Sequence, residues 1–359
     1  MSTTYGKNLK LSIFGGSHDE KIYMTLDGIP ADHKIDTDEL CAFMSRRAPG
    51  QNKYSTQRKE PDVPVFSSGL DENGVTTGDR IECAIYNTNQ HSSDYSSLTD
   101  IPRPSHADYA AKMKYGDKVD LRGGGHFSGR LTALMCVAGG ICLQILKELN
   151  IKIASHVCSV GSVIDKRFDP IDPEEQMTSL AGKEFPTISE EAGEKMKAII
   201  DEARLDGDSV GGVVETAITG LAPGHGEHIF DGIEGRISSF VFGIPAVKGI
   251  EFGLGFDSAA LRGSENNDEF YTDGRSVFTR TNNCGGILGG MTNGMPVIFR
   301  AAMKPTPSIA KEQNSVSLSK MENVKLKISG RHDPCVVVRA VPVFEAAAAI
   351  AIYDILLDR

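Results

Sequence analysis

Two long apolar segments, residues 131–149 and 341–357, constrain the fold of this chain most strongly. Polar side chains interrupt both of them, such as Gln144 in the first and Glu345 in the second. This pattern is typical of helices buried in a protein core and not of membrane spans. Because strand-like runs occur on both sides of these helices in the sequence, the pattern favours helices sandwiched between sheets.

Other elements follow from capping residues and from alternating apolar runs. A helix is expected over 38–47, capped by Asp36 or Thr37, and further helices over 189–204 and 344–357. Strands are expected over 9–14, 22–26, 213–219, 297–303 and 336–341. No linker, low-complexity block or short repeat divides the sequence, so one domain over 1–359 is expected.

Four short segments place a titratable or basic side chain beside glycine or proline. They are Gly-Gly-Ser-His at 15–18, the surroundings of His106, the glycine-rich stretch 123–130 and Arg-His-Asp-Pro at 331–334. Such segments are typical of turns where backbone and side chain face a ligand. They are far apart in the sequence, so a fold must bring them together, which favours an enzyme with one anion-binding site.

The formal net charge of -10 argues against a nucleic-acid-binding protein. One segment is nonetheless basic and contains no acidic residue. It includes Arg46, Arg47, Lys53, Arg58 and Lys59. In an acidic protein this segment indicates steering of a small anion, the alternative being a solvated helix end and loop.

The seven cysteines form no CxxC pair, which is typical of reduced, mostly structural thiols in a cytoplasmic protein. The first ten residues lack the apolar core of a signal peptide. His225 and His228 have a spacing that could suit a metal, but no third ligand is obvious, so no metal is expected.

His18 and His106 are the histidines best placed for proton transfer, because each lies in a polar turn. Arg103 precedes His106 and can bind an anion that His106 protonates. Asp333 lies close after Arg331, where a carboxyl group normally stays ionised. Such a carboxylate suits a proton acceptor and equally a plain ion pair.

Two glycine-rich stretches could hold a phosphate-bearing ligand. Residues 123–128 precede Arg130 and could expose unpaired N–H groups to a phosphate, although G-x-G-x-x-S lacks the third glycine of a dinucleotide fingerprint. Residues 282–290 precede a strand, and the Lys304–Ser308 segment then supplies a cation and two hydroxyls. Each stretch alone could be ordinary turn chemistry, and together they favour a binding cradle.

The sequence resembles the chorismate synthase family. The matching segments occur in the same order as in the family and are spread over nearly the whole chain. The resemblance is carried by Gly-Gly-Ser-His at 15–18, Leu-Asp-Gly-Ile-Pro at 26–30, Arg-Arg at 46–47, Gln-Arg-Lys-Glu-Pro-Asp at 57–62, Gly-Asp-Ser-Val-Gly-Gly at 207–212, Ile-Pro-Ala-Val-Lys-Gly at 244–249, Gly-Gly-Ile-Leu-Gly-Gly at 285–290, Lys-Pro-Thr at 304–306 and Arg-His-Asp-Pro-Cys at 331–335. The sequence departs from the family pattern at Gly16, Ala48, His126 and Phe127.

The resemblance implies an α+β fold, a β-α-β sandwich with a helical core between antiparallel sheets. It also implies a carbon–oxygen lyase that converts 5-enolpyruvylshikimate 3-phosphate to chorismate by anti-1,4-elimination of phosphate, with reduced FMN as cofactor. By the same resemblance His106 would protonate the departing phosphate and His18 would protonate or tune the reduced flavin. Asp333 would assist flavin N5 in removing the C-6 hydrogen.

Further site residues are implied in the same way. Those expected to line the flavin are His126, Phe127, Ser128, Pro245, Ala246, Gly289, Lys304, Pro305, Thr306, Pro307, Ser308 and Arg331. Those expected to hold the phosphate and carboxylates of the substrate, or an NADP phosphate, are Arg46, Arg47, Lys53, Arg58, Arg103 and Arg130.

A homotetramer without nucleic-acid or membrane partners is expected on the same ground, and NADPH as an indirect reductant stays open. The alternatives are a non-catalytic flavin-binding relative and an NAD(P)H-dependent oxidoreductase.

Overall fold

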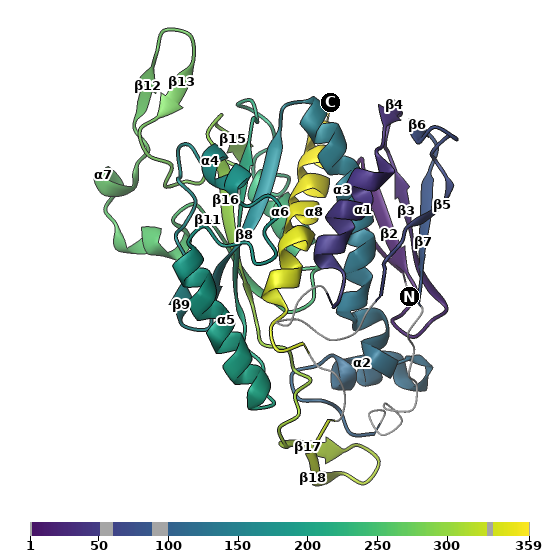
Figure 1. Cartoon of the computed structure of the whole chain (residues 1–359). Helices are drawn as coiled ribbons and strands as arrows, with labels where there is room; N and C mark the ends of the chain where they lie inside the picture. Colours follow the sequence, from purple (N-terminus) through teal and green to yellow (C-terminus); the bar gives the residue numbers. More distant parts are fainter. Residues whose placement is uncertain (1, 51–59, 88–99, 329–332, 359) are drawn as a thin grey trace.

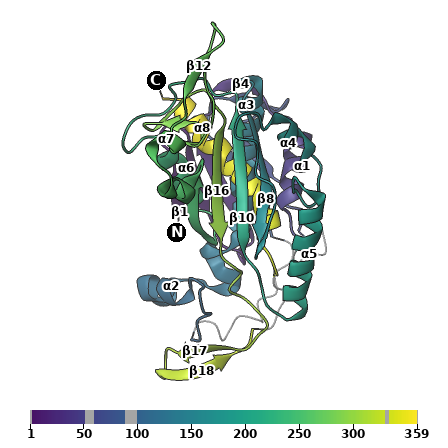
Figure 2. The same ribbon diagram turned by 90° about the vertical axis from the view of Figure 1, so that its left-hand side faces the viewer.

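The computed structural model describes residues 2–50, 60–87, 100–328 and 333–358. Its main elements form three layers, with helices packed between two sheets (Figure 1). The view turned by 90° shows the second sheet in front of the helix layer (Figure 2). The expected α+β sandwich with a helical core is confirmed.

The first sheet has the strand order β1-β2-β3-β7-β5, and all its neighbouring strands are antiparallel. Its strands are β1 (Ser2–Tyr5), β2 (Lys10–Phe14), β3 (Lys21–Asp27), β5 (Val65–Ser68) and β7 (Ile81–Tyr86). Along β3, Ile22, Met24 and Leu26 are fully buried whereas Tyr23 is exposed. This alternation places one face of the sheet against the helices and leaves the other face open. A small second pair joins β4 (Ala31–Lys34) to β6 (Val75–Thr77).

The second sheet has the order β11-β16-β10-β8-β9 and is again antiparallel. Its strands are β8 (Lys152–Val160), β9 (Val163–Ile164), β10 (Gly212–Thr219), β11 (Val247–Phe252) and β16 (Val297–Met303). Its central strands are buried on both faces, because a small apolar cluster around Phe168, Met177 and Ile298 covers the side away from the helix layer. Helix α4 (Glu174–Ser179) lies on this side, whereas α5 (Glu190–Leu205) packs its buried Met196 and Ile200 into the main core.

The helix layer is built from α1 (Thr37–Arg47), α3 (Thr132–Glu148), α6 (Ile233–Val241) and α8 (Val337–Leu356). Helices α3 and α8 pack closely because Gly139 has no side chain: a Cβ there would lie 2.2 Å from Cβ of Ala346. Residues Gly129–Glu148 are long and apolar enough by composition to cross a membrane. However, 78% of their most apolar window is buried inside the fold, as in the core helix that the sequence predicts.

Shorter elements surround this sandwich. They are α2 (Asp108–Tyr115), α7 (Gly263–Asn266), the 3-10 turns η2 (Gly116–Lys118), η3 (Arg122–Phe127), η4 (Gly129–Leu131) and η5 (Gly255–Ala260), and the hairpins β12 (Phe270–Thr272) with β13 (Val277–Thr279), β14 (Ile287–Leu288) with β15 (Met291–Thr292) and β17 (Gln313–Ser317) with β18 (Glu322–Leu326). The hairpins β12–β13 and β17–β18 project from opposite ends of the molecule (Figure 1).

Most expected elements are confirmed, and the helix α1 begins after Asp36, whose side chain accepts hydrogen bonds from the N–H groups of Asp38 and Glu39. The strand expected over 336–341 is wrong, because these residues form the first turns of α8. A buried valine-rich run lacks the regular polar face that would separate a helix from a strand. All seven cysteines are free, and five of them are buried.

Candidate active site

A cavity of about 810 Å³ lies at one end of the helix layer. Arg47 at the end of α1, Thr132 at the start of α3 and Val336 just before α8 all line it. The N-termini of two long helices therefore point toward the same space, and their partial positive charges favour an anion there. Residues at the start of β11 and the end of β16 complete the opposite wall.

The glycine turn at the start of η3 forms part of the cavity wall and packs against His18. Gly123, Gly124 and Gly125 have φ values of 56°, 94° and 53°, which side chains other than hydrogen rarely allow. A Cβ on Gly123 would lie 2.2 Å from Cε1 of His18, and one on Gly124 would lie 3.4 Å from Nε2 of His106. Both candidate histidines thus pack against adjacent glycines of one turn.

His18 is held behind this turn and is itself buried. The hydroxyl of Ser17 lies 3.1 Å from His18 Nδ1 and donates a hydrogen bond to the carbonyl of Arg122. The N–H of Ser17 donates to the carbonyl of Gly125. The Gly-Gly-Ser-His segment and the glycine turn are therefore tied together by their backbones, as the spacing of the sequence segments predicted.

His106 lines the cavity and is held by a buried ion pair. Its Nδ1 lies 2.6 Å from Asp108 Oδ1, and Arg103 binds the same carboxylate through Nε at 2.7 Å and Nη2 at 2.8 Å. Burial alone would raise the pKa of Asp108, but hydrogen bonds from Arg103 and His106 outweigh it and hold that pKa well below its usual range. Asp108 is therefore an ionised carboxylate beside His106.

Asp333 lines the cavity just before α8 begins. Its carboxylate accepts a hydrogen bond of 2.5 Å from Arg339 Nη1, one turn into the helix. Arg339 also donates from Nε to the backbone carbonyl of Arg47. The ion pair keeps Asp333 at the wall of the cavity.

The arginines expected to bind anions have carboxylate partners. Arg47 donates to Asp62, to Thr132 Oγ1 and to the carbonyl of Gly129, and burial lowers the pKa of Arg47 to about 10 while Asp62 opposes this. Arg130 contacts the carboxylates of Glu60 and Asp62. Among the described residues Arg130 Nη2 has no hydrogen-bond partner, which leaves one donor for a ligand.

The opposite wall is formed by the 245–246 and 304–308 segments. Ala246 has φ of 74° and its carbonyl accepts a hydrogen bond from the N–H of Lys304, which ties the segments together. Burial and, less strongly, nearby Lys248 lower the pKa of Lys304. Thr306 Oγ1 is buried and has no hydrogen-bond partner among the described parts of the chain.

The structure brings most of the predicted site residues to this cavity. Those that line it are Arg47, Arg103, His106, His126, Phe127, Ser128, Arg130, Pro245, Ala246, Lys304, Thr306, Pro307, Ser308 and Asp333. His18 lies behind its wall, whereas Arg46, Gly289 and Pro305 do not line it. Arg46 binds Glu345 of α8 through two hydrogen bonds, and Gly289 lies in the turn between β14 and β15. Lys53, Arg58 and Arg331 lie outside the described residues.

Sequence reasoning missed the carboxylates that pair with the arginines. Asp62 and Glu60 directly follow the basic segment, and Asp108 follows Arg103 in an Arg-x-x-His-x-Asp pattern. These spacings are a usable signal for Asp108, because Arg103, His106 and Asp108 can meet within one turn. No local pattern indicates that Asp62 would join Arg47 to Arg130.

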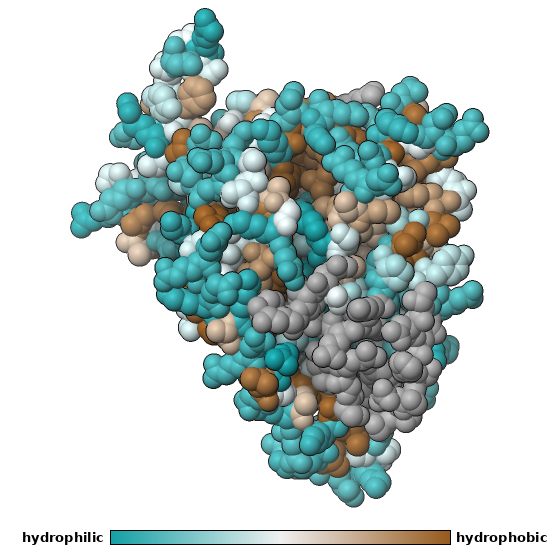
Figure 3. Space-filling model, in the orientation of Figure 1, coloured by the Kyte–Doolittle hydropathy of each residue, from teal (hydrophilic) through white to brown (hydrophobic). Residues whose placement is uncertain are grey.

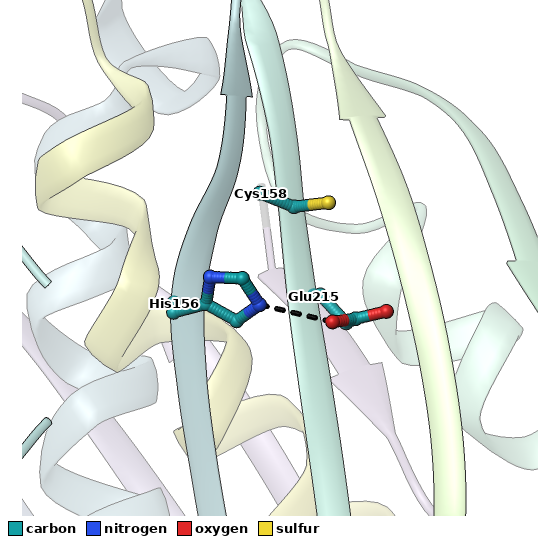
Figure 4. A group of neighbouring side chains, drawn as sticks. All are labelled: His156, Cys158 and Glu215. Carbon is teal, nitrogen blue, oxygen red and sulfur yellow. Dashed lines mark hydrogen bonds and ion pairs between the residues drawn. The ribbon is translucent and has the colours of Figure 1, made fainter. Parts of the chain in front are cut away.

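A second cluster of titratable groups lies in the second sheet, away from the cavity. His156 and Cys158 of β8 and Glu215 of β10 have ligand atoms within 4.8 Å of one another (Figure 4). His156 Nε2 already lies 2.9 Å from Glu215, its Nδ1 lies 3.3 Å from Asp165, and Arg300 donates to Glu215. This arrangement is a buried ion-pair network, and the nearby guanidinium opposes a bound cation.

Comparison with known proteins agrees with the geometry of the cavity. Residues 9–357 match the family model of chorismate synthase. Chorismate synthases from Lancefieldella parvula and Thermococcus kodakarensis are 43% and 44% identical to this chain, each over 99% of it and over 96% and 97% of their own lengths. A crystal structure of a chorismate synthase superposes with a TM-score of 0.77 at 31% identity, covering 98% of this chain and 93% of that one. The chain belongs to the chorismate synthase family.

Proposed function

We propose that this chain, as one domain over 1–359, converts 5-enolpyruvylshikimate 3-phosphate to chorismate and phosphate. This is the last step of the shikimate pathway to aromatic amino acids, and it makes the protein a carbon–oxygen lyase acting on phosphates. The observation that carries the assignment of roles is the single cavity of about 810 Å³ that His106 and Asp333 share beside two helix N-termini. This cavity combines a proton donor, a carboxylate and the partial positive charges of two helix N-termini, which favour a bound phosphate.

The side chains have distinct parts in this proposal. His106 protonates the departing phosphate, which Arg47, Arg103 and Arg130 hold together with the substrate carboxylates. Lys53 and Arg58 are proposed to assist. His18 acts from behind the glycine turn by protonating the reduced flavin or tuning its charge. Asp333 assists the removal of the C-6 hydrogen. Because Arg47 and Arg130 are fixed by Asp62, they offer donors in set positions at little entropic cost.

The cavity fits the reduced FMN that the family requires. Its volume is in the range of cofactor sites, roughly 300 to 1,000 Å³. The buried Thr306 hydroxyl and Arg130 Nη2 lack partners among the described residues, as expected for groups that bind a ligand. When bound, FMN would supply electron density transiently to the departing C–O bond. His126, Phe127, Ser128, Pro245, Ala246, Lys304, Thr306, Pro307 and Ser308, together with Arg331, are proposed to hold it.

We also propose a cytoplasmic homotetramer that binds a small-molecule substrate and neither nucleic acid nor membrane. Apolar side chains on the open face and edge of the first sheet support self-association, and they gather at the right of the view in Figure 3. On the strands of this sheet, Tyr23, Val65 and Tyr86 are each more than 40% exposed. Phe270 and Val277 of the β12–β13 hairpin are over 60% exposed and offer a second contact.

The proposal is tested by anaerobic phosphate release from 5-enolpyruvylshikimate 3-phosphate. One reaction contains chemically reduced FMN, and the other contains oxidised FMN with NADPH. Release only with reduced FMN supports a lyase that depends on external reduction, and release in both adds flavin reduction by NADPH. Release in neither contradicts the proposal and favours a non-catalytic flavin-binding protein. Consumption of NADPH in step with turnover would instead indicate an oxidoreductase.

A further inference from the structure

His106 is oriented by a carboxylate that does not itself line the cavity. Asp108, the first residue of α2, has a side chain only 1% exposed, and its Oδ1 lies 2.6 Å from His106 Nδ1. Arg103 holds this carboxylate from the other side through three hydrogen bonds, one of them from its backbone N–H. The orientation of the His106 ring is therefore set by a buried pair.

The short distance fixes which ring nitrogen carries the proton. Asp108 is ionised and can only accept, so Nδ1 must donate to it. Arg103 Nη2 also lies 3.1 Å from Nδ1 and carries two N–H groups, one of which donates to Asp108 at 2.8 Å, but the contact between Nδ1 and the carboxylate is the shorter one. If Nδ1 were unprotonated, its lone pair would face a carboxylate oxygen at 2.6 Å, which is repulsive.

We infer that Asp108 is a positioning residue that keeps His106 in the Nδ1–H tautomer and presents Nε2 to the glycine turn at the cavity, an inference that rests on the function proposed above. Nε2 is the ring nitrogen next to Gly124. With Nδ1 committed to Asp108, the transferable proton of the cationic ring is the one on Nε2. Loss of that proton to the departing phosphate then leaves the neutral ring in the tautomer that Asp108 stabilises.

Asp108 also balances the cations that face His106. Arg103 lies against the ring, and Lys304 Nζ donates to the carbonyl of the neighbouring Ser105 at 3.1 Å. From the remaining side the uncharged glycine turn separates His106 from His18. Without the carboxylate, two cations would oppose protonation of His106. An acid that loses its proton more readily acts only at lower pH.

The first test is Asp108→Asn, with Asp117→Asn as the matched control. Asp117 lies just after α2, its side chain is 94% exposed, and it pairs with Lys112. Asp108→Asn is expected to lower kcat by up to about ten-thousandfold, the loss found when the carboxylate behind the histidine of a Ser-His-Asp triad is replaced by an amide. It should also move the high-pH limb of the kcat profile to lower pH. Asp117→Asn should change neither quantity.

A double-mutant cycle separates positioning from a structural role. In the His106→Ala background, Asp108→Asn should cost no further turnover, because its effect passes through His106. Equal losses in both backgrounds, or an unmoved pH limb, would overturn the inference. Unchanged turnover of His106→Ala alone would instead contradict the acid role in the proposed function.

The tautomer can be read without the Asp108 variant, which guards against a variant that does not fold. Protein labelled with [15N]histidine is observed by 1H–15N correlation with its histidine rings in the neutral form, and the signals of His106 are identified by their loss in His106→Gln. A proton on Nδ1 and none on Nε2 is expected. A proton on Nε2 would overturn the inference whatever the kinetics show.

Discussion

The carboxylate of Asp354 accepts a hydrogen bond of 2.7 Å from the backbone N–H of Leu9, so the last helix holds the turn that joins the first two strands. The N–H groups of Lys7 and Asn8 donate to the same carboxylate, and Arg236 Nη2 lies 3.1 Å from it. Asp354 is fully buried. A charged side chain in the most apolar helix is therefore compensated by three backbone donors and one guanidinium.

Asp354→Ala should lower the free energy of unfolding by about 3 kcal/mol, because it leaves three backbone donors without their acceptor and removes the nearest carboxylate of Arg236, whose remaining carboxylate partners among the described residues are Asp358 and Asp231. The measurement is chemical denaturation at fixed protein concentration. Asp231→Ala is the control: Asp231 is half exposed and pairs with Lys7, so its loss should cost less than about 1 kcal/mol. Equal losses in the two variants would contradict the anchoring role.

Gly123→Ala should reduce turnover by about a hundredfold, because displacement of a reacting group by about 1 Å has that cost. The new Cβ would lie 2.2 Å from His18, and φ at this position is 56°. Gly182→Ala is the matched control, since φ there is 75°, no atom lies within 4 Å of a Cβ, and the residue does not line the cavity. Turnover of the two variants is compared by phosphate release. Equal turnover of the two variants would contradict the importance of the turn.

The sequence predicted the sandwich because its two core helices are apolar on all faces and carry small residues where they touch. The same lack of a polar face made the prediction of a strand at 336–341 wrong, because a buried valine run has no periodicity that separates strand from helix. Helix α1 was predictable because Asp36 caps it locally. Elements marked by local sequence signals were predicted correctly, whereas the segment 336–341, whose secondary structure depends on burial, was not.

The sequence predicted the segments that form the site, but it did not predict how the charged side chains of the site pair with one another. Glycine turns and histidines leave local signals, so the segments around His106 and Asp333 were found before the cavity was known. The pairing of Arg47 with Asp62 and of Arg46 with Glu345 depends on distant elements that the fold brings together. The basic segment therefore presents less free positive charge in its described part than its composition indicates.

His106→Ala should retain flavin binding and lose turnover by about a hundredfold to ten-thousandfold, because the acid is removed while the rest of the cavity stays. Flavin binding is measured by fluorescence titration and turnover by phosphate release. His228→Ala is the control, since His228 is 75% exposed and far from the cavity walls that the structure describes. Turnover equal to that of the unchanged protein would contradict the acid role.

The His156 network should make stability depend on pH. Burial opposes the charged ring, but the hydrogen bonds that the ring donates to Asp165 and Glu215 outweigh it and raise the pKa of His156. Because the pKa of His156 is higher in the folded protein, the protonated ring contributes its full stabilisation of the fold below the unfolded pKa of about 6.5. This contribution is lost as the pH rises through the pKa of the folded protein. The pKa values of Asp165 and Glu215 are lowered, so their contribution is lost only in acid.

His156→Gln should therefore cost most between about pH 5 and 6.5, with a smaller cost at higher pH. The measurement is the free energy of unfolding against pH for both proteins. His228→Gln, which changes an exposed histidine, should leave the pH profile unaltered. A cost that grows with pH would contradict a cationic His156.

Thr306→Val should weaken flavin binding while leaving the free protein at least as stable. Thr306 lines the cavity, and its buried hydroxyl has no hydrogen-bond partner among the described residues, so a methyl group of similar size removes a desolvation cost without breaking a contact. In the complex the same change removes a hydrogen bond worth about 0.5 to 1.5 kcal/mol, or about 2-fold to 13-fold in affinity.

Fluorescence titration with FMN measures the affinity, and denaturation of the ligand-free protein measures the stability. Thr77→Val, which changes an exposed threonine of β6, is the control for both. Weaker binding with lost stability would indicate that the hydroxyl supports the fold, and unchanged binding would show that the ligand does not reach it. The opposite signs expected for the two measurements are what separate a binding group from a structural one.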